Sequence, residues 1–328
     1  MFTKQEKSFV FSWFNNNKSK IFLSIVKRYR GDKFENYCKL YRSAINMDFE
    51  SILKLPNIIL NCVNEEVVIR KYKGSNKINK EYNEQVNFNT NLLPVYQDET
   101  SLYSAELVNI YQYYLKKLQY KPVFFPSLIN TKDLYYSGHL PGWGEQIFTI
   151  QDTDMHLVPT VECHFASGKI KEYGQYYSFT ECFRKEAGSR GQRDKGLIRT
   201  NQFGKCEIFS ICKTEEWGEK LTLMIRTVCN LLKLFNFNFR VVRLPRWDMS
   251  GASSITFDVE IWLPISKRWI EISSISYVGD YQNKFRNIKQ NNTVCINGSC
   301  LPVGRVIVCL REYYTKDEIV SIFSNLKY

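Results

Sequence analysis

The segment from Cys182 to Phe209, CFRKEAGSRGQRDKGLIRTNQFGKCEIF, places fixed charges at both ends of a predicted strand–loop–strand unit. Strand residues of equal parity share a face, so Arg184 and Glu186 are expected to point the same way. If the two strands pair, Glu207 can face the same pocket. A guanidinium beside carboxylates suits a zwitterionic ligand that carries an anionic group next to an amine. The alternative is a cross-strand ion pair on a solvated sheet.

A second candidate lies in VPTVECHF, where Thr160 and Glu162 have the spacing of residues on one strand face. The neighbours of Glu162 in sequence are apolar, and an unpaired carboxylate in such a setting is costly. Glu162 therefore needs a partner, which is either an arginine of the protein or a group of a ligand.

A third candidate is RWIEISSISYVGDYQ. Glu271 and Ser273 would share one strand face, and Ile272 and Ser274 the other, unless the strand bulges. Clustered Glu and Ser oxygens suit a hard cation, most commonly Mg²⁺ with a nucleotide. An ordinary edge strand is the alternative.

A fourth candidate is CINGSCLPVGRVIVCLREYY. Asn297 and Gly298 predict a turn, and Ser299 could cap a following helix. Arg305 would lie on this otherwise apolar helix, where a guanidinium needs an anion. A phosphate would meet it with bidentate geometry, and a buried glutamate is the alternative.

The elements that must position these residues follow from hydrophobic periodicity. Helices are predicted over 33–46, 49–55, 101–120 and 214–235, and a turn into a helix over 298–314. Strands are predicted over 177–184, 205–213, 239–244, 255–263 and 269–277, with a short one at KPVFFP. Strands come in runs with helices interspersed, which favours an α+β fold: a mixed, mostly antiparallel sheet flanked by helices. We expect a small basic appendage over 1–72, a polar linker over 73–91 and a catalytic domain over 92–328.

Composition narrows the functional classes. The 328 residues carry 45 Lys and Arg against 33 Asp and Glu, a formal charge of +12, which favours phosphate-bearing partners. Ten cysteines without a C-x-x-C pair predict buried thiols in a reducing compartment, and three histidines are too few for a metal cluster. No apolar run is long enough to predict a membrane span. We expect a cytoplasmic protein, although the basic first thirty residues are also compatible with an organellar transit segment.

In this order, the motifs resemble the catalytic domain of seryl-tRNA synthetases, a family of class II aminoacyl-tRNA synthetases, over about Leu92 to Tyr314. The stretch FRKEAGSRGQRDKGLIRTNQF is similar to the family's motif 2, and NGSCLPVGR is similar to motif 3. Three further stretches resemble family motifs: EISSISYVGDYQ, DMSGASSITFDVEIWLP and SGHLP, the last where the family has T-G-Q-L-P.

The resemblance implies a class II synthetase fold with ATP and Mg²⁺ as cofactors, and it assigns site residues. The serine-binding residues would be Thr160, Glu162, Arg184, Glu207, Asn297 and Ser299. The ATP-binding residues would be Arg184, Lys185, Glu186, Arg199, Thr200, Asn201, Gln202, Phe203, Glu271, Ile272, Ser273, Ser274 and Arg305, with Phe203 stacked on the adenine. Glu271 and Ser274 would be the metal ligands, and Arg184, Arg305 and Glu271 would act on the reacting phosphates.

The sequence departs from the family in several places. Residues 192–195 read QRDK where the family usually has R-D-T-R, Asn201 replaces a histidine, and Cys300 replaces a glycine, which matters if that position needs a positive φ. The first 91 residues lack the heptads of the family's N-terminal coiled-coil arm, so this arm is expected to be absent or replaced.

The expected function is that of a serine--tRNA ligase, which activates L-serine with ATP and transfers it to the 3′ end of tRNA, acting as a homodimer. Two alternatives stay open at this point. One is an arm-less paralogue that passes activated serine to a non-tRNA acceptor, and the other is a catalytically silent RNA-binding or structural paralogue.

Overall fold

The computed structural model describes residues 4–60, 63–82, 98–186, 196–285 and 292–326. Its centre is an eight-stranded sheet with the order β1-β7-β8-β9-β10-β6-β5-β2. Only the short β2–β5 pair is parallel, and the other pairs of this sheet are antiparallel. The predicted α+β fold with a mixed, mostly antiparallel sheet is therefore confirmed.

The strands of this sheet in spatial order are β1 (Val67–Tyr72), β7 (Phe239–Arg243), β8 (Ile255–Leu263), β9 (Arg268–Gly279), β10 (Thr293–Pro302), β6 (Gln202–Lys213), β5 (Gly174–Phe183) and β2 (Lys121–Pro122). A small separate ribbon pairs β3 (Leu128–Asn130) with β4 (Met155–Leu157). The helices are α1 (Lys4–Arg28), α2 (Gly31–Ile45), α3 (Phe49–Leu53), α4 (Asp98–Lys117), α5 (Thr131–Ser137), α6 (Glu162–Ala166), α7 (Trp217–Leu234), α8 (Val303–Tyr313) and α9 (Lys316–Asn325). Short 3₁₀ turns occur at η1 (Gly144–Gln146), η3 (Gly196–Ile198), η4 (Thr214–Glu216) and η5 (Tyr281–Phe285).

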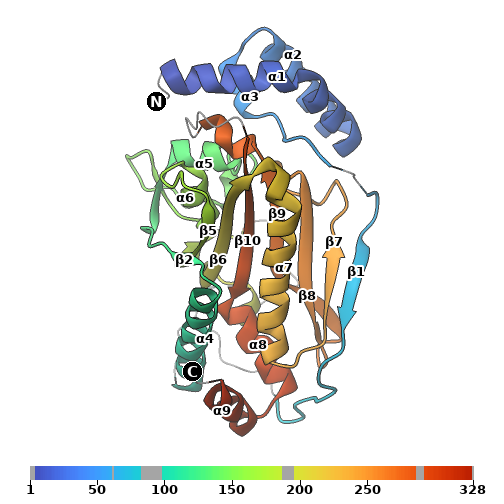
Figure 1. Cartoon of the computed structure of the whole chain (residues 1–328), viewed down its shortest axis with the longest axis vertical. Helices are drawn as coiled ribbons and strands as arrows, with labels where there is room; N and C mark the ends of the chain where they lie inside the picture. The colour runs from blue at the N-terminus through green and yellow to red at the C-terminus, as the bar shows by residue number, and fades with distance from the viewer. Residues whose placement is uncertain (1–3, 61–62, 83–97, 187–195, 286–291, 327–328) are drawn as a thin grey trace.

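The alternation of side chains along β6 separates the two faces of the sheet. Cys206 and Ile208 point into the main core, which α4, α7 and α8 complete, and Figure 1 shows α7 running along the sheet beside β9 and β10. Phe209 and Ile211 point to the other face and pack in a second cluster, where the Phe209 ring stacks on Phe165 of α6. The polar positions of β6 that precede Phe209 on this second face are therefore available for a site.

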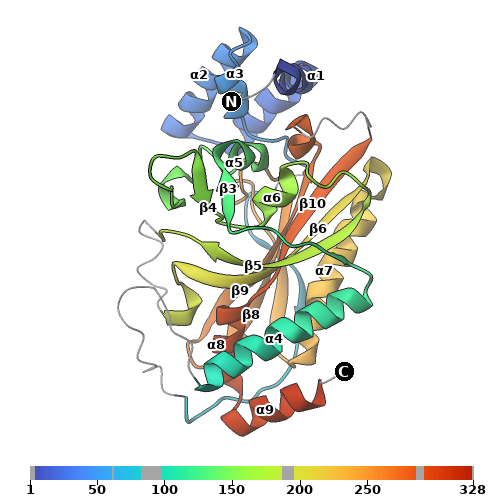
Figure 2. The same cartoon turned by 90° about the vertical axis from the view of Figure 1, so that its left-hand side faces the viewer.

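The N-terminal helices α1, α2 and α3 gather at one end of the molecule, as both views show (Figures 1 and 2). They belong to the second cluster, together with residues of α6, β6 and η5. The buried Arg28 side chain donates hydrogen bonds to the carbonyl oxygens of Ser250, Gly251 and Ser253. Trp13 Nε1 donates to Asp280 Oδ1 at 3.3 Å. These helices are therefore packed on the catalytic domain.

The sequence assigned residues 67–72 to the appendage, whereas the structure places them in the main sheet as β1, paired antiparallel with β7. The start of the predicted linker also contacts the domain, since Gly74 N donates to Asn238 Oδ1 and Asn79 Nδ2 donates to the carbonyls of Arg311 and Tyr314. Residues 83–91 of that linker lie outside the described residues.

The turn predicted at Asn297 and Gly298 is wrong, because both residues lie within β10. Gly298 is needed for close packing of neighbouring strands: a Cβ there would come within 2.9 Å of Ile275 Cγ1. Ser299 does not cap α8, whose N-cap is Pro302. The positive φ in this stretch, 67°, belongs to Leu301, so Cys300 does not need the freedom of the glycine that it replaces.

Among the described residues, none of the helices combines the length and the apolar character needed to cross a membrane. The nine described cysteines are free thiols, and all but Cys38 are buried.

Candidate active site

The register of three adjacent strands collects polar residues on one face of the sheet. On β6, Phe203, Lys205 and Glu207 are alternate residues, and Cys182 of β5 is paired with Phe203. Arg184 has the parity of Cys182 and follows the end of β5, and Ser299 of β10 is paired with Glu207. The expectation that Glu207 shares a face with Arg184 therefore agrees with the observed register.

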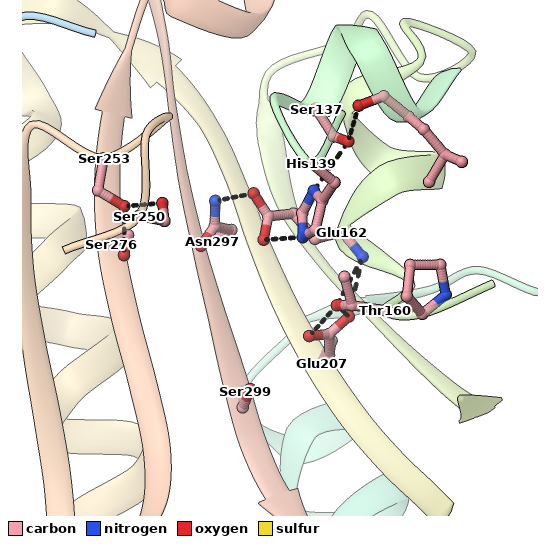
Figure 3. Close-up of polar contacts among 12 residues, drawn as sticks. Ser137, His139, Thr160, Glu162, Glu207, Ser250, Ser253, Ser276, Asn297 and Ser299 are labelled. Carbon is pink, nitrogen blue, oxygen red and sulfur yellow. Dashed lines mark hydrogen bonds and ion pairs between the residues drawn. The ribbon is translucent and has the colours of Figure 1, made fainter. Parts of the chain in front are cut away.

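Glu207 is the centre of a buried hydrogen-bond network (Figure 3). Thr160 Oγ1 lies 2.7 Å from Glu207 Oε1 and 2.8 Å from Oε2, and the backbone N–H of Glu162 donates to Oε2 at 2.8 Å. Lys205 forms an ion pair with the same carboxylate, and its Nζ also donates to Thr160 Oγ1 and Ser299 Oγ at 3.2 and 3.4 Å. Lys205 was missed at the sequence level, although its position two residues before Glu207 places it on the same face.

Glu162 reaches this network in a different way from the one predicted. The segment around it is not a strand, because Glu162 begins α6. Glu162 Oε1 accepts a hydrogen bond from Asn297 Nδ2 at 2.6 Å (Figure 3). It accepts a second from Gln282 Nε2 at 3.0 Å, so both of these donors are neutral amides. Burial and the neighbouring Glu207 carboxylate raise the pKa of Glu162 to about 8, although Lys205 acts in the opposite direction. This carboxyl group is therefore suited to receive a cation from a ligand.

Arg184 follows the end of β5 and contacts two aromatic rings beside the polar cluster. Its guanidinium is 4.8 Å from the centroid of Trp143 and 5.0 Å from that of Phe203, and its Nε donates to the carbonyl of Pro159 at 3.1 Å. Cation–π contacts of this kind hold a guanidinium in place while leaving its terminal nitrogens for an anion. Phe203, the predicted adenine-stacking residue, thus lies beside the predicted anion-binding residue.

Residues just after β5 form an ion pair and a hydrogen bond with residues just before β6. Glu186 has a left-handed backbone, with φ of 52°, so the expectation from strand parity does not apply to it. Its carboxylate lies 2.6 Å from Arg199 Nε. Asn201 Nδ2 donates to the carbonyl of Arg184, and Thr200 Oγ1 donates to that of Gln202. Lys185 N donates to the carbonyl of Gln146. The altered loop at 192–195 lies outside the described residues.

A bulge in β9 determines which of its side chains point to the same face of the sheet. Glu260 pairs with Glu271 and Val259 pairs with Ser273, so Ile272 is the extra residue on β9. The bulge places Glu271 on the face of Ser274 and of its partner Asp258. Ser273 instead hydrogen-bonds to the carbonyl of Ser299 through its hydroxyl.

Asp258 is a candidate that sequence reasoning missed, even though it lies in the recognised stretch FDVEIWLP. Burial, together with the Glu271 carboxylate, raises the pKa of Asp258 to about 8. Its Oδ1 is buried, with no hydrogen-bond partner among the described residues. Within the same residues, no three His, Cys, Asp or Glu side chains are arranged to hold a metal by themselves. A cation at Glu271, Ser274 and Asp258 would therefore need oxygens from a ligand, as Mg²⁺ usually does.

Arg305 projects from α8 toward this acidic face. Its Nη1 donates to the carbonyl of Glu271 at 2.8 Å and lies 3.9 Å from Glu271 Oε1, and its Nε donates to the carbonyl of Ile198. Its side chain is half-buried. Hydrogen bonds to two backbone carbonyls hold the guanidinium at the edge of the apolar face of α8.

Comparison with known proteins agrees with this geometry. Residues 150–314, half of the chain, match the family described as the tRNA synthetase class II core domain (G, H, P, S and T). The chain is 33% identical over 216 residues to the serine--tRNA ligase of Mycoplasma mobile, a match that covers 62% of this chain and 51% of that protein. It is 30% identical to the serine--tRNA ligase of Mycoplasmopsis agalactiae, with 95% of this chain and 83% of that protein covered.

A crystal structure of seryl-tRNA synthetase from Pyrococcus horikoshii complexed with ATP has a similar fold, with a TM-score of 0.74, 19% identity and coverage of 99% of this chain and 90% of that chain. In several curated relatives, including the M. mobile protein, the match spans about half of their length. The family profile and the M. agalactiae match are nevertheless extensive enough to place the protein: the chain belongs to the serine--tRNA ligase family of class II aminoacyl-tRNA synthetases.

Proposed function

We propose that this protein activates L-serine with ATP to form seryl-adenylate and then transfers the seryl group to the 3′ end of tRNA. The observation that carries the proposal is the convergence of Thr160, Glu162, Glu207, Asn297 and Ser299 beside Arg184 on one sheet face. The names and the fold of the relatives support the same activity.

The polar cluster supplies complementary groups for the three polar parts of serine. Glu162 would bind the ammonium group, because its carboxyl has no cationic hydrogen-bond partner among the described residues. Arg184 would bind the carboxylate and the α-phosphate of ATP. Glu207, Thr160 and Ser299 would surround the side-chain hydroxyl. A site built to hydrogen-bond a hydroxyl rejects the analogue without it by about 10⁴-fold, since buried acceptors are left unpaired.

Activation would depend on positioning and charge neutralisation. The serine carboxylate is ionised at neutral pH, so it can attack the α-phosphorus in line without a general base while pyrophosphate leaves. Arg184 and Arg305 would offset the charge that spreads over the phosphate oxygens. Glu271, Ser274 and Asp258 would hold Mg²⁺ against the phosphates, where the ion neutralises negative charge. Phe203 would stack on the adenine ring, and Glu186 and Arg199 would contact the nucleotide beside it.

Transfer would follow when a ribose hydroxyl of the terminal adenosine of tRNA attacks the adenylate carbonyl. The net charge of +12 supports binding of a polyanion such as tRNA. We also propose a homodimer. Two large apolar side chains near the start of the domain are exposed: Leu102 of α4 by 65% and Phe124, which follows β2, by 90%. A partner subunit would cover such side chains.

The first experiment is serine-dependent ATP–pyrophosphate exchange, tested against the other amino acids. We expect exchange with serine, and its loss in Arg184→Ala. Exchange with no amino acid would refute the proposed activity and favour a silent paralogue.

Charging of purified tRNA, with and without its variable arm, is the second experiment. Exchange without charging of any tRNA would exclude the transfer step and favour a different acceptor for the activated serine.

A further inference from the structure

His139 has a fixed position beside the proposed ammonium site. It follows Gly138, the left-handed residue that ends α5 with φ of 80°, and its backbone N–H donates to the carbonyl of Leu134 at 3.0 Å. A Cβ on residue 138 would come within 3.0 Å of Ala252 Cβ, so the glycine allows this close approach. The imidazole is buried and packs edge-on against Trp143, with 4.8 Å between ring centroids. The ring therefore has a defined place and orientation.

The hydrogen bonds of Ser137 identify the nitrogen of His139 that carries the proton. Ser137 Oγ donates its single hydrogen to the carbonyl of Leu134 at 3.0 Å, and it lies 2.9 Å from His139 Nδ1 (Figure 3). With this hydroxyl hydrogen assigned to the Leu134 carbonyl, Oγ accepts from Nδ1–H, which assigns the proton of the neutral ring to Nδ1. Burial, with the positive charges of Arg184 and Lys205, lowers the pKa of His139 to about 3, so the ring is neutral. Its Nε2 therefore carries a lone pair and no hydrogen.

That lone pair faces Glu162 Oε2, which is a second acceptor when the carboxyl group is ionised. His139 Nε2 lies 4.0 Å from Glu162 Oε2 (Figure 3). Asn297 and Gln282 both donate to the other oxygen, Oε1, and no described residue donates a hydrogen bond to Oε2. Two acceptors separated by 4.0 Å leave room for one donor atom within about 2.9 Å of both. In the free protein at neutral pH the raised pKa of Glu162 keeps a proton on this carboxyl, and the bound ammonium group would replace that proton as the donor between the two acceptors.

We infer that His139 is a substrate-positioning residue whose Nε2, together with Glu162 Oε2, binds the ammonium group of the amino acid. An ammonium group has three hydrogens and can satisfy both acceptors, whereas a hydroxyl group has one and leaves an acceptor unpaired. The pair therefore selects an amine over a hydroxyl at this carbon. The inference rests on the proposed activation of serine and adds His139 to the residues that the family resemblance assigns to that site.

The test compares L-serine with L-glycerate, in which a hydroxyl replaces the amine, as ligands of His139→Phe and Ser137→Ala. The first variant keeps a ring and removes the acceptor. The second keeps the imidazole but removes the acceptor of Nδ1–H, which favours the Nε2–H tautomer. In both, KM for serine in pyrophosphate exchange should rise by about tenfold or more, while KM for ATP stays unchanged. The preference for serine over glycerate should fall by a similar factor.

His156→Gln is the matched control, because His156 lies in the β3–β4 ribbon and its ring bonds to Thr131 and Thr149. This variant should leave KM for serine and the preference for serine over glycerate as in the wild type. Absence of serine-dependent exchange in the wild-type protein would refute the proposed function. Exchange in the wild type, with an unchanged serine-to-glycerate preference in His139→Phe, would overturn the inference alone.

Ring-nitrogen NMR gives a readout that a merely structural role would not move. The chain has only three histidines, so the signals of His139 can be assigned with His139→Phe and His156→Gln. We expect the Nδ1–H tautomer at neutral pH, and a shift of the Nε2 resonance when serine is added. An Nε2–H tautomer in the free wild-type protein would contradict the inference.

Discussion

Lys205 and Glu207 lie two residues apart on β6 and form a buried ion pair within the polar cluster of the candidate site. Removing one member of a buried pair leaves an uncompensated charge, which typically costs about 3–5 kcal/mol. We expect Lys205→Met to lower the free energy of unfolding by about this amount, as measured by urea denaturation. The double variant Lys205→Met/Glu207→Gln removes both charges and should recover part of the loss. Equal losses in the single and double variants would show that the charge pairing is not the cause.

Binding of serine should release a proton at Glu162. The carboxyl of Glu162 has a pKa of about 8, so it is mostly protonated in the free protein at pH 7, and a bound ammonium group favours its ionised form. Calorimetry in buffers of different ionisation enthalpy should show release of about one proton per site at pH 7 and much less above pH 9. Glu162→Gln should abolish the release and weaken binding. The same proton release in that variant would assign it to another group.

The same shift predicts an effect on stability. The raised pKa means that the folded protein holds this proton more tightly than the unfolded chain, in which the pKa is near 4.5. The contribution of Glu162 to stability therefore falls as the pH rises from about 4.5 to about 8. Serine should raise the melting temperature more at pH 8.5 than at pH 6. The difference should be smaller in Glu162→Gln, and an equal difference in both proteins would contradict the prediction.

Asp258 should set the Mg²⁺ requirement. Because its Oδ1 is buried without a partner among the described residues, on the face of Glu271 and Ser274, we expect Asp258→Asn to raise the Mg²⁺ concentration that gives half-maximal pyrophosphate exchange. KM for serine should not change. Glu66→Gln is the control: it removes a carboxylate that lies just before β1 and pairs with Arg240 at 3.1 Å. An unchanged Mg²⁺ dependence in Asp258→Asn would remove Asp258 from the cation site.

Gly298 should tolerate no side chain. Its Cβ would lie 2.9 Å from Ile275 Cγ1 in the middle of the sheet, so Gly298→Ala should destabilise the protein by about 1–3 kcal/mol. Gly204→Ala in β6 is the comparison. The atoms that its Cβ would meet are the ends of the Glu181 and Phe179 side chains, which can move aside. Chemical denaturation should show the larger loss in Gly298→Ala, and the reverse order would contradict this reading of the sheet packing.

The sequence predicted best where the geometry depends on local alternation. The shared face of Arg184 and Glu207 followed from strand parity, since β5 and β6 are regular up to their ends. Glu186 escaped this rule because the chain turns left-handed after the strand. The grouping of Glu271 with Ser274 depended on a bulge, and a bulge is defined by the partner strand, which one sequence segment cannot show.

Other predictions differed from the structure where the role of a residue depends on its contacts with distant parts of the chain. An Asn-Gly pair usually indicates a turn, but at 297–298 the glycine serves strand packing and the asparagine binds Glu162. Thr160 and Glu162 do converge on Glu207, although through the start of α6 and not through a strand face. Lys205 has the strand parity of Glu207, and Asp258 lies in the stretch FDVEIWLP, but only the register of their strands shows that they reach the site.

Strand β1 forms one edge of the sheet. It pairs with β7, which comes much later in the sequence. During synthesis from the N-terminus, β1 emerges from the ribosome while the segment that pairs with it has not yet been made. Ordering β1 must therefore wait until most of the catalytic domain has been translated. Such a long-range pairing slows folding and leaves the early strand exposed to other polypeptides in the meantime.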